Sequence, residues 1–379
     1  MKIAIDNVSP GISTAPGGKG GMRMYLESLL TEMLRAAPEH RFVLLTPDWN
    51  ASFDIPDDPR LEVVPLRSVP RSRMQRVIYE RTAYPSAIRR AGCDVFLGLC
   101  NTLPPLLNIP SAVVIQSTQF QFVPEAYGFL QRHYLRLGVA SAVRAADAVI
   151  TVSEHSRQDV IGWLGTDPRK VTSVLHGVFF SSTEVNRPVP TAERPYILCV
   201  SAFYPYKNLF RLIEAFSILK GAALPHELVI VGGDTPGVTR ADLLAHARAL
   251  GVEDAVRLPG RVSQDELEEF YRGADVFVMP SLYETFGLPV LEAMALGCPV
   301  VAARASSLPE VAGDAAELVD PLSPDSIAHG LAAVITSPSR RAELVGLGRE
   351  RVTEFSWEKA AKQTVEVLET VAARRGITC

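Results

Sequence analysis

The alternation of short apolar runs with helical patterns constrains the fold of this chain more than any other feature. In the first half, five runs read as buried strands, at 2–6, 42–46, 94–98, 111–116 and 148–151. In the second half, six more read the same way, at 196–202, 227–233, 255–260, 276–280, 299–303 and 316–320. Helical patterns lie between them, for example at 27–34, 129–146, 208–220 and 263–274. Strands that alternate with helices form parallel sheets covered on both faces. We therefore expect an α/β protein with two doubly wound, Rossmann-like domains facing each other across a cleft.

A polar, proline-bearing stretch at 179–195 shows no periodicity and reads as the linker between these domains. We predict an N-terminal domain over 1–188, a second domain over 189–355, and a C-terminal helix over 356–379 that returns to the N-terminal domain. Ligands of doubly wound sheets bind beyond the carboxyl ends of the strands. The functional residues are therefore expected in the loops that follow the strands.

Composition restricts the class of protein. The 379 residues are 47% hydrophobic and 21% charged, which is ample apolar material for two cores. The five cysteines are scattered without metal-ligand spacing, as suits a reducing compartment. The N-terminal run lacks the apolar core of a signal peptide, and no run is long enough to span a bilayer. We therefore expect a cytoplasmic protein.

Charge is distributed unevenly along the chain. Residues 1–190 carry 20 basic and 17 acidic side chains, whereas the remainder carries 18 and 25. The segment 71–90 contains six arginines and one glutamate. One interpretation is a solvated helical face. The other is an electropositive surface that meets an anionic membrane, or a phosphate-bearing acceptor, and so gives peripheral contact with the inner face of the cell membrane. Nucleic acid is disfavoured as a partner because the chain as a whole is acidic.

The stretch SLYETFGLPVLEAM, at 281–294, holds two glutamates eight positions apart, Glu284 and Glu292. It follows a predicted strand, and Pro289 suits the first turn of a helix. The start of that helix offers an anion the backbone amides of Phe286, Gly287 and Leu288. Gly287 lets a phosphate approach the backbone closely.

The two carboxylates would repel an anion that they touched, so each is expected to bind hydroxyl groups on either side of the phosphates. A nucleotide-sugar fits this requirement, with Glu284 at the sugar and Glu292 at the ribose diol. The alternative is that Glu284 is a surface loop residue and Glu292 an exposed helical one.

The run at 274–321, which contains the E-x7-E motif Glu284–Glu292, resembles the retaining glycosyltransferases of family 4. The resemblance covers nearly the whole chain and is densest from 196 to 320. It implies the two-domain GT-B fold, a nucleotide-diphosphate sugar as donor and transfer with retention of configuration. Thr285 departs from the family pattern, which usually has glycine there.

The same resemblance implies roles for residues outside the motif. Lys207, in YPYKNLFRLIEAF (204–216), would carry the lysine that neutralises the diphosphate, and with Glu284 it forms the expected catalytic pair. Ala202 stands where the family often has an arginine, so part of the cationic clamp is missing or supplied elsewhere. The nucleotide-sugar ligands implied are Lys207, Glu292, Phe286, Gly287, Leu288, Arg261, Val262, Ser201, Gly20 and Gly21.

In the first half, the segment 17–30 resembles the family's glycine-rich loop after the first strand. It fits neither the nucleotide-triphosphate nor the dinucleotide pattern. On the acceptor side we expect Arg23 together with Gln116 and Ser117, which stand where many relatives have His-Asp. Glutamine cannot act as an acid or base, so catalysis should require no protein base at that site. His176, at the predicted domain exit, is expected to be structural.

We therefore expect a glycosyltransferase that moves a sugar, with mannose favoured, to a glycan or lipid-linked acceptor in bacterial surface polysaccharide or lipopolysaccharide biosynthesis. No Asp-x-Asp pattern lies near the donor loop, so we predict no metal site, no essential divalent cation and no cofactor besides the donor substrate. Two alternatives remain open: a GT-B-fold sugar-nucleotide epimerase, and a non-catalytic sugar-nucleotide-binding subunit.

Overall fold

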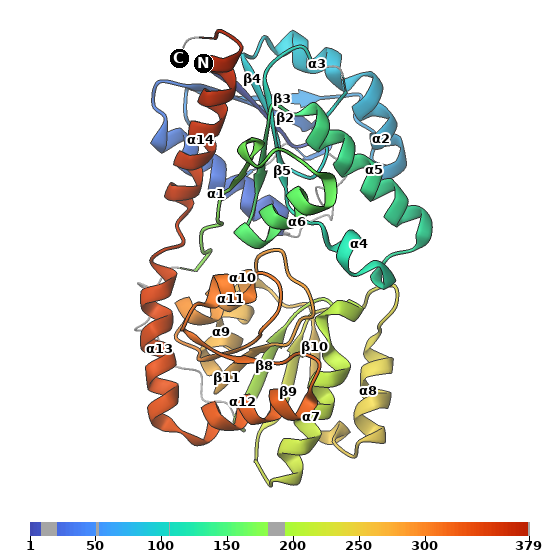
Figure 1. Cartoon of the computed structure of the whole chain (residues 1–379), viewed down its shortest axis with the longest axis vertical. Helices are drawn as coiled ribbons and strands as arrows, with labels where there is room; N and C mark the ends of the chain where they lie inside the picture. The colour runs from blue at the N-terminus through green and yellow to red at the C-terminus, as the bar shows by residue number, and fades with distance from the viewer. Residues whose placement is uncertain (9–20, 51–52, 106, 181–193, 378–379) are drawn as a thin grey trace. The chain divides into compact units, whose positions relative to one another are not determined.

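The chain divides into two compact units. A computed structural model describes residues 1–8, 21–50, 53–105, 107–180 and 194–377. The first unit comprises Met1–Gln121, Phe129–Gly177 and Ser356–Cys379, and the second comprises Phe122–Gly128 and Val178–Phe355. The predicted boundary between 188 and 189, and most of the predicted linker, lie outside the described residues. Figure 1 shows each unit as a sheet flanked by helices.

The sheet of the first unit is wholly parallel, with the strand order β3-β2-β1-β4-β5-β6-β7. Its inner strands are buried at almost every position, because helices cover both faces. The strands are β1 (Lys2–Asp6), β2 (Arg41–Pro47), β3 (Leu61–Leu66), β4 (Val95–Gly98), β5 (Ser111–Ile115), β6 (Ala148–Thr151) and β7 (Val171–Ser173).

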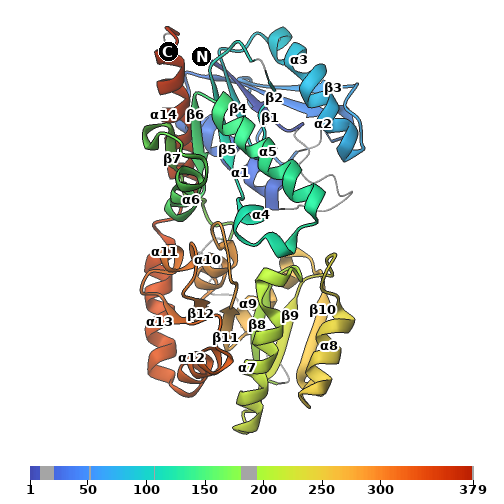
Figure 2. The same cartoon turned by 45° about the vertical axis from the view of Figure 1, so that its right-hand side comes forward.

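The helices of the first unit come from both ends of the chain. The C-terminal helix α14 packs against α1 and against the central strands of the sheet. Figure 2 shows α2 and α3 beside the sheet. Their apolar side chains pack against β1, β2 and β4. The helices are α1 (Gly21–Ala36), α2 (Arg73–Thr82), α3 (Tyr84–Ala91), α4 (Gln119–Phe122, which ends in the second unit), α5 (Phe129–Ala145), α6 (Glu154–Leu164) and α14 (Trp357–Arg374), with short turns η1 (Asp48–Asn50) and η3 (Pro168–Lys170).

The second unit repeats the pattern. Its parallel sheet has the order β10-β9-β8-β11-β12-β13, so the chain winds outward from β8 in one direction and then from β11 in the other. The strands are β8 (Tyr196–Val200), β9 (Glu227–Val231), β10 (Val256–Gly260), β11 (Val276–Met279), β12 (Val300–Ala303) and β13 (Ala316–Val319). The prediction of two doubly wound parallel sheets is confirmed.

Helices again cover both faces of this sheet. In one layer α7 packs against α8 and α12, and in the other α10 packs against α9, α11 and α13. The helices are α7 (Leu209–Gly221), α8 (Arg240–Ala249), α9 (Gln264–Gly273), α10 (Leu288–Ala295), α11 (Leu308–Ala312), α12 (Pro324–Thr336) and α13 (Pro338–Val352), with short turns η2 (Pro124–Ala126), η5 (Pro205–Lys207) and η6 (Glu253–Ala255).

The two strands that the sequence pattern did not indicate, β3 and β7, lie at the edges of the first sheet. Edge strands are only partly covered, and the six residues of β3 are all exposed or half-buried. They therefore lack the continuous apolar run that marks a central parallel strand. The arginine-rich segment 71–90, for which a helical face was one interpretation, forms most of α2 and α3.

Candidate functional site

The order of strands in the second sheet fixes where its site lies. The order reverses between β8 and β11, and a doubly wound sheet opens a crevice at the carboxyl ends of such a strand pair. The loop after β8 carries Lys207, and the loop after β11 carries Glu284. Two residues chosen from separate sequence motifs thus follow the two strands at the switch point.

Lys207 and Glu284 form a buried ion pair. The lysine Nζ lies 2.6 Å from Glu284 Oε1, and the two side chains are only 14% and 8% exposed. The same ammonium lies 5.5 Å from the centroid of the Tyr206 ring. Two charges removed from water need such close mutual contact to be tolerated. The pair therefore places a cation and a carboxylate side by side at the switch point.

Asn208 fixes the turn that presents Lys207. It is buried, with φ of 62°, a left-handed conformation that asparagine adopts more readily than most residues. Its Nδ2 donates to the carbonyl oxygens of Pro280, at 3.0 Å, and Pro321, at 2.7 Å. One side chain therefore ties the loop after β8 to those after β11 and β13, a role that the sequence did not reveal.

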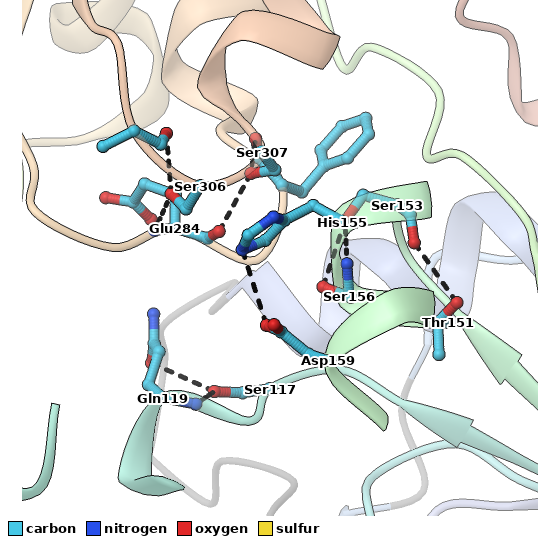
Figure 3. A network of polar contacts seen from close by, with 12 residues as sticks. Ser117, Gln119, Thr151, Ser153, His155, Ser156, Asp159, Glu284, Ser306 and Ser307 are labelled. Atoms are coloured by element: carbon cyan, nitrogen blue, oxygen red, sulfur yellow. Dashed lines mark hydrogen bonds and ion pairs between the residues drawn. The ribbon is translucent and has the colours of Figure 1, made fainter. Parts of the chain in front are cut away.

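Two serines hold the loop that carries Glu284, and sequence reasoning missed both. The backbone amide of Glu284 donates to Ser306 Oγ at 2.7 Å. The Ser307 hydroxyl lies within hydrogen-bonding distance of the carbonyl oxygens of Glu284, at 2.9 Å, and Phe286, at 2.7 Å (Figure 3). Ser306 has a positive φ of 51°, a conformation uncommon outside glycine. The only sequence signal was their place between a buried strand and a Leu-Pro-Glu helix start.

The helix α10 begins where the sequence predicted, at Leu288, with Pro289 in its first turn. Gly287 precedes it with φ of 114°, and a Cβ there would lie 2.8 Å from Leu308 Cδ2. The first N–H groups of a helix have no acceptor within the helix and lie at the positive end of its dipole. The turn after Glu284 is therefore suited to an anion, and only glycine fits it without rearrangement.

Glu292 lies one turn into α10 and is 8% exposed. The Tyr271 hydroxyl, on α9, donates to its Oε2 at 2.9 Å. A capping box between Ser263 and Glu266 starts α9 and so helps to fix Tyr271. Burial raises the pKa of Glu292 to about 7. The alternative that Glu284 and Glu292 are exposed surface residues is wrong, because both are buried.

The remaining residues predicted for the second unit follow neighbouring strands. Ser201 follows β8, and the backbone of Gly232, after β9, approaches it so closely that a Cβ would lie 1.8 Å from Ser201 O. Arg261 follows β10 with Val262, and its Nε lies 3.2 Å from the position of a Cβ on Gly233. The sequence-predicted residues of this unit thus gather at the carboxyl ends of β10, β8 and β11. Gly232 and Gly233, which the sequence indicated only as the end of a strand, lie at the carboxyl end of β9, between those of β10 and β8.

The residues predicted for the acceptor side lie in the first unit, after β1 and β5. The backbone amide of Gln116 donates to Asn101 Oδ1 at 2.7 Å, and that of Ser117 to the same oxygen at 3.3 Å. The side chain of Gln116 donates to Leu99 O at 3.3 Å and also hydrogen-bonds to Tyr25. These hydrogen bonds hold the Gln116 backbone and its side-chain amide in place.

Arg23 lies on α1, and its Nε donates to Glu27 Oε1 at 2.9 Å. Its guanidinium also lies 5.4 Å from the centroid of the Phe53 ring. Gly21 begins α1, whereas Gly20 lies outside the described residues.

His176 is buried between aromatic rings. Its ring centroid lies 4.8 Å from that of Tyr25 and 5.6 Å from that of Trp357. Burial lowers its pKa to about 3, so the imidazole is neutral at physiological pH. These contacts fit the structural role expected for it.

Within the described residues, Glu39, His40 and Glu369 of the first unit form a group of potential metal ligands, whose ligand atoms lie within 4.8 Å of one another. Buried His40 places Nε2 2.9 Å from Glu369 Oε1, a contact that a hydrogen bond explains without a metal. His40 precedes β2 and Glu369 lies on α14, so this group is separate from the loops at the carboxyl ends of the strands.

One expectation about the arginine-rich segment needs correction. Arg76 was expected to contribute to an electropositive surface, but it is only 4% exposed and its guanidinium lies 5.9 Å from the centroid of the Trp49 ring. The arginine turns inward because it sits on the face of α2 that packs on the unit's core, beside buried Tyr79 and Glu80. Arg81, Arg89 and Arg90 are exposed.

Two family models match the chain. Residues 182–351 match the family described as Glycosyl transferases group 1, and residues 19–179 match Glycosyltransferase Family 4. The chain belongs to glycosyltransferase family 4. The match extends over both units and agrees with the resemblance seen in the sequence.

Named relatives of the family include two mannosyltransferases. The MMP alpha-(1->4)-mannosyltransferase of Mycolicibacterium hassiacum is 34% identical over 253 residues, which cover 65% of this chain and 58% of that protein. The O-antigen chain mannosyltransferase B of Escherichia coli is 29% identical over 253 residues, covering 64% and 65%. The aligned region thus spans less than two thirds of either relative.

Solved structures show the same architecture. Sucrose-phosphate synthase from Thermosynechococcus elongatus superposes with a TM-score of 0.77 at 22% identity, over 98% of this chain and 99% of that one. HepE from Anabaena, in complex with UDP-glucose, gives 0.70 at 17% identity, over 97% and 99%. At these identities the likeness is one of fold, and that fold is GT-B.

Proposed function

We propose that this glycosyltransferase transfers a hexose, preferentially mannose, from a nucleotide-diphosphate sugar to a glycan or lipid-linked acceptor, with retention of configuration. The observation that carries the proposal is the Lys207–Glu284 pair beside the start of α10 at the switch point of the second sheet. A diphosphate matches the cation and the helix N-terminus, and hydroxyl groups match the carboxylates. The mannosyltransferases among the relatives, and the UDP-glucose bound to HepE, support this choice of donor class.

In this proposal the chain acts by binding and positioning. Lys207 and the first amides of α10 bind the diphosphate and stabilise its charge as the bond from the sugar C1 to the phosphate oxygen breaks. The acceptor oxygen bonds to C1 on the same face, and its proton passes to the departing diphosphate oxygen. Glu284 stabilises the positive charge that develops on the sugar. Gln116 orients a hydroxyl group by hydrogen bonding and accepts no proton, because an amide cannot serve as a base at neutral pH.

The experiment that tests this function is a donor screen. The purified full-length chain is incubated with each common nucleoside-diphosphate hexose and a panel of glycan and polyprenol-linked acceptors, and release of nucleoside diphosphate is measured. Acceptor-dependent release with one donor, and an unchanged anomeric configuration in the product by NMR, would support the proposal. Interconversion of the donor sugar without acceptor would instead indicate an epimerase, and binding without turnover a non-catalytic subunit.

Activity is expected to survive EDTA. Lys207 and the N-terminus of α10 take the place of a cation at the diphosphate in this proposal. We expect turnover in 5 mM EDTA, about the concentration that removes trace metal, to equal turnover in added Mg²⁺ within about twofold, a difference of less than about 0.5 kcal/mol in activation free energy. Loss of activity in chelator, restored by Mg²⁺ or Mn²⁺, would contradict a metal-independent reaction.

We further propose that the first unit meets an anionic, membrane-borne acceptor through α2 and α3. Among the helices of the described residues, none combines the length and apolarity that crossing a bilayer requires. Helix α2 exposes Met74, at 78%, and Ile78, at 59%, one turn apart. Apolar side chains flanked by arginines suit the interface of an anionic bilayer.

Vesicle sedimentation tests this contact. The full chain should pellet with anionic vesicles at low salt and be released at high salt, because each exposed arginine adds about 1 kcal/mol near such a surface. Charge reversal at Arg81, Arg89 and Arg90 should abolish pelleting. Reversal of three exposed arginines of the second unit, at Arg194, Arg248 and Arg257, is the matched control and should leave it intact. If the unaltered protein did not pellet, the membrane contact would be refuted, and the interpretation of segment 71–90 as a solvated helical face would remain.

A further inference from the structure

We propose that Phe122–Gly128, here called the strap, positions the Lys207–Glu284 pair. The strap belongs to the second unit, although the chain on both sides of it belongs to the first. It begins five positions after Ser117 in the chain. The proposal deepens the proposed function, since it names residues that act through the two catalytic side chains without touching the substrate.

The strap packs on the two residues that immediately precede the ion pair in sequence. Val123 is buried in one cluster with Tyr206 and Tyr283. The ring of Phe122 stacks on that of Tyr283, with centroids 5.5 Å apart and planes inclined by 11°. Tyr206 precedes Lys207, and Tyr283 precedes Glu284. The strap thus contacts both catalytic loops through a single apolar cluster.

The other end of the strap reaches the same loop. The turn η2 within the strap packs against η5, and burial raises the pKa of Tyr127 to about 12, with a further contribution from the Tyr204 phenol. Tyr204 in turn stacks on Tyr206, with ring centroids 5.3 Å apart and planes inclined by 10°. Aromatic side chains therefore line the loop after β8 from Tyr204 to the residue beside Lys207.

The loops after β8 and β11 also contact each other directly beside the strap. Leu282 N donates to Tyr206 O at 2.8 Å, and the Lys207–Glu284 contact follows one residue further along the first loop and two residues further along the second. A stacked ring and a buried valine restrict how far the loops can separate. An ion pair with Nζ and Oε1 2.6 Å apart is sensitive to small displacements of either backbone. The strap is therefore placed to set this distance.

Phe122 allows a clean test, because it is 42% exposed and its truncation should leave the core intact. Phe122→Ala is expected to lower kcat about 10-fold, since small displacements of catalytic groups cost up to about 100-fold in rate. Affinity for UDP and GDP, measured by calorimetry, should change less than about twofold, corresponding to less than about 0.5 kcal/mol. Phe122→Tyr keeps the ring and should restore kcat. Ile218→Ala, at the same 42% exposure on α7 of the same unit, is the matched control and should behave as the unaltered chain.

A second readout does not depend on turnover. In protein labelled with ¹³C-lysine, the Lys207 Cε resonance should move in Phe122→Ala toward its position in Glu284→Gln, and stay in place in Ile218→Ala. If the protein turns over no donor, the shift of the Lys207 resonance alone tests whether the strap positions the ion pair. Failure of the strap proposal can therefore be distinguished from failure of the proposed function. The proposal is overturned if the resonance does not move, if kcat is unaffected, or if kcat falls only in step with nucleotide affinity and melting temperature.

Discussion

Lys207→Ala is expected to lower kcat by about 100- to 1000-fold, the effect of removing one preorganised group that stabilises transition-state charge. It should also destabilise the protein by about 3–5 kcal/mol, because Glu284 is left as an unpaired buried carboxylate. Affinity for a nucleoside diphosphate should fall by about 10- to 100-fold, whereas affinity for the corresponding nucleoside should hardly change. Calorimetry with both ligands and chemical denaturation measure these effects.

Two further variants separate the roles of Lys207. In Lys207→Met/Glu284→Leu the buried charges are replaced together, so stability should largely return while activity stays lost. Lys220→Ala removes a lysine of the same unit whose Nζ donates to Leu224 O, and should affect neither nucleotide affinity nor kcat. Equal weakening of nucleoside and nucleoside diphosphate by Lys207→Ala would contradict its assignment to the diphosphate.

Glu292 is expected to make the stability of the unliganded protein depend on pH. Burial raises its pKa to about 7 in the folded state, against about 4.3 in an unfolded chain. The contribution of the neutral Glu292 carboxyl to the free energy of unfolding is therefore fully present below about pH 4.3 and is lost as pH rises through about 7. The Glu292→Gln protein cannot ionise at this position, so its free energy of unfolding should fall less than that of the unaltered protein between these pH values. The difference between the two decreases should reach up to about 3 kcal/mol at pH 8. Denaturation of both proteins at pH 4.5, 6 and 8 measures the difference.

The same residue should matter in the opposite sense for binding. Glu292→Ala removes a carboxylate expected at the ribose diol, and nucleotide affinity should fall by about 1.5–3 kcal/mol. Burial also raises the pKa of Glu80 to about 7. Glu80 is present in the unaltered protein and in the Glu292 variants, so it contributes a pH dependence of stability that remains when Glu292 is replaced. Tyr271→Phe is a useful companion, because the lost hydrogen bond should raise the pKa of Glu292 further. Unchanged nucleotide affinity in a folded Glu292→Ala protein would exclude the ribose assignment.

Local patterns predicted the elements of the site well. Continuous apolar runs identified the central strands, because a parallel strand covered on both faces needs apolar side chains at every position. Pro289 predicted where α10 begins, since proline suits the first turn of a helix. The edge strands β3 and β7 lack that signal because one side of each is open.

The partners of the site residues could not be predicted in the same way. The serines that hold the Glu284 loop lie 22 and 23 positions away from it, and Asn208 reaches Pro321 across 113 positions. No periodic pattern links residues so far apart. The inward turn of Arg76 was missed for a related reason, since an arginine pattern reports charge and not the face of the helix that meets the core.

The sequence by itself determined the α/β class, the two parallel sheets, the start of α10 and the identity of Lys207, Glu284 and Glu292 as candidate residues. Only the tertiary structure decided that Lys207 and Glu284 touch, that Glu292 is buried against Tyr271, and that Phe122–Gly128 packs with the second unit. The physical reason is that periodicity and turn chemistry act over a few residues and specify local backbone and burial. Contacts between distant segments depend on strand order, which brings the loops after β8 and β11 together although 77 positions separate Lys207 from Glu284.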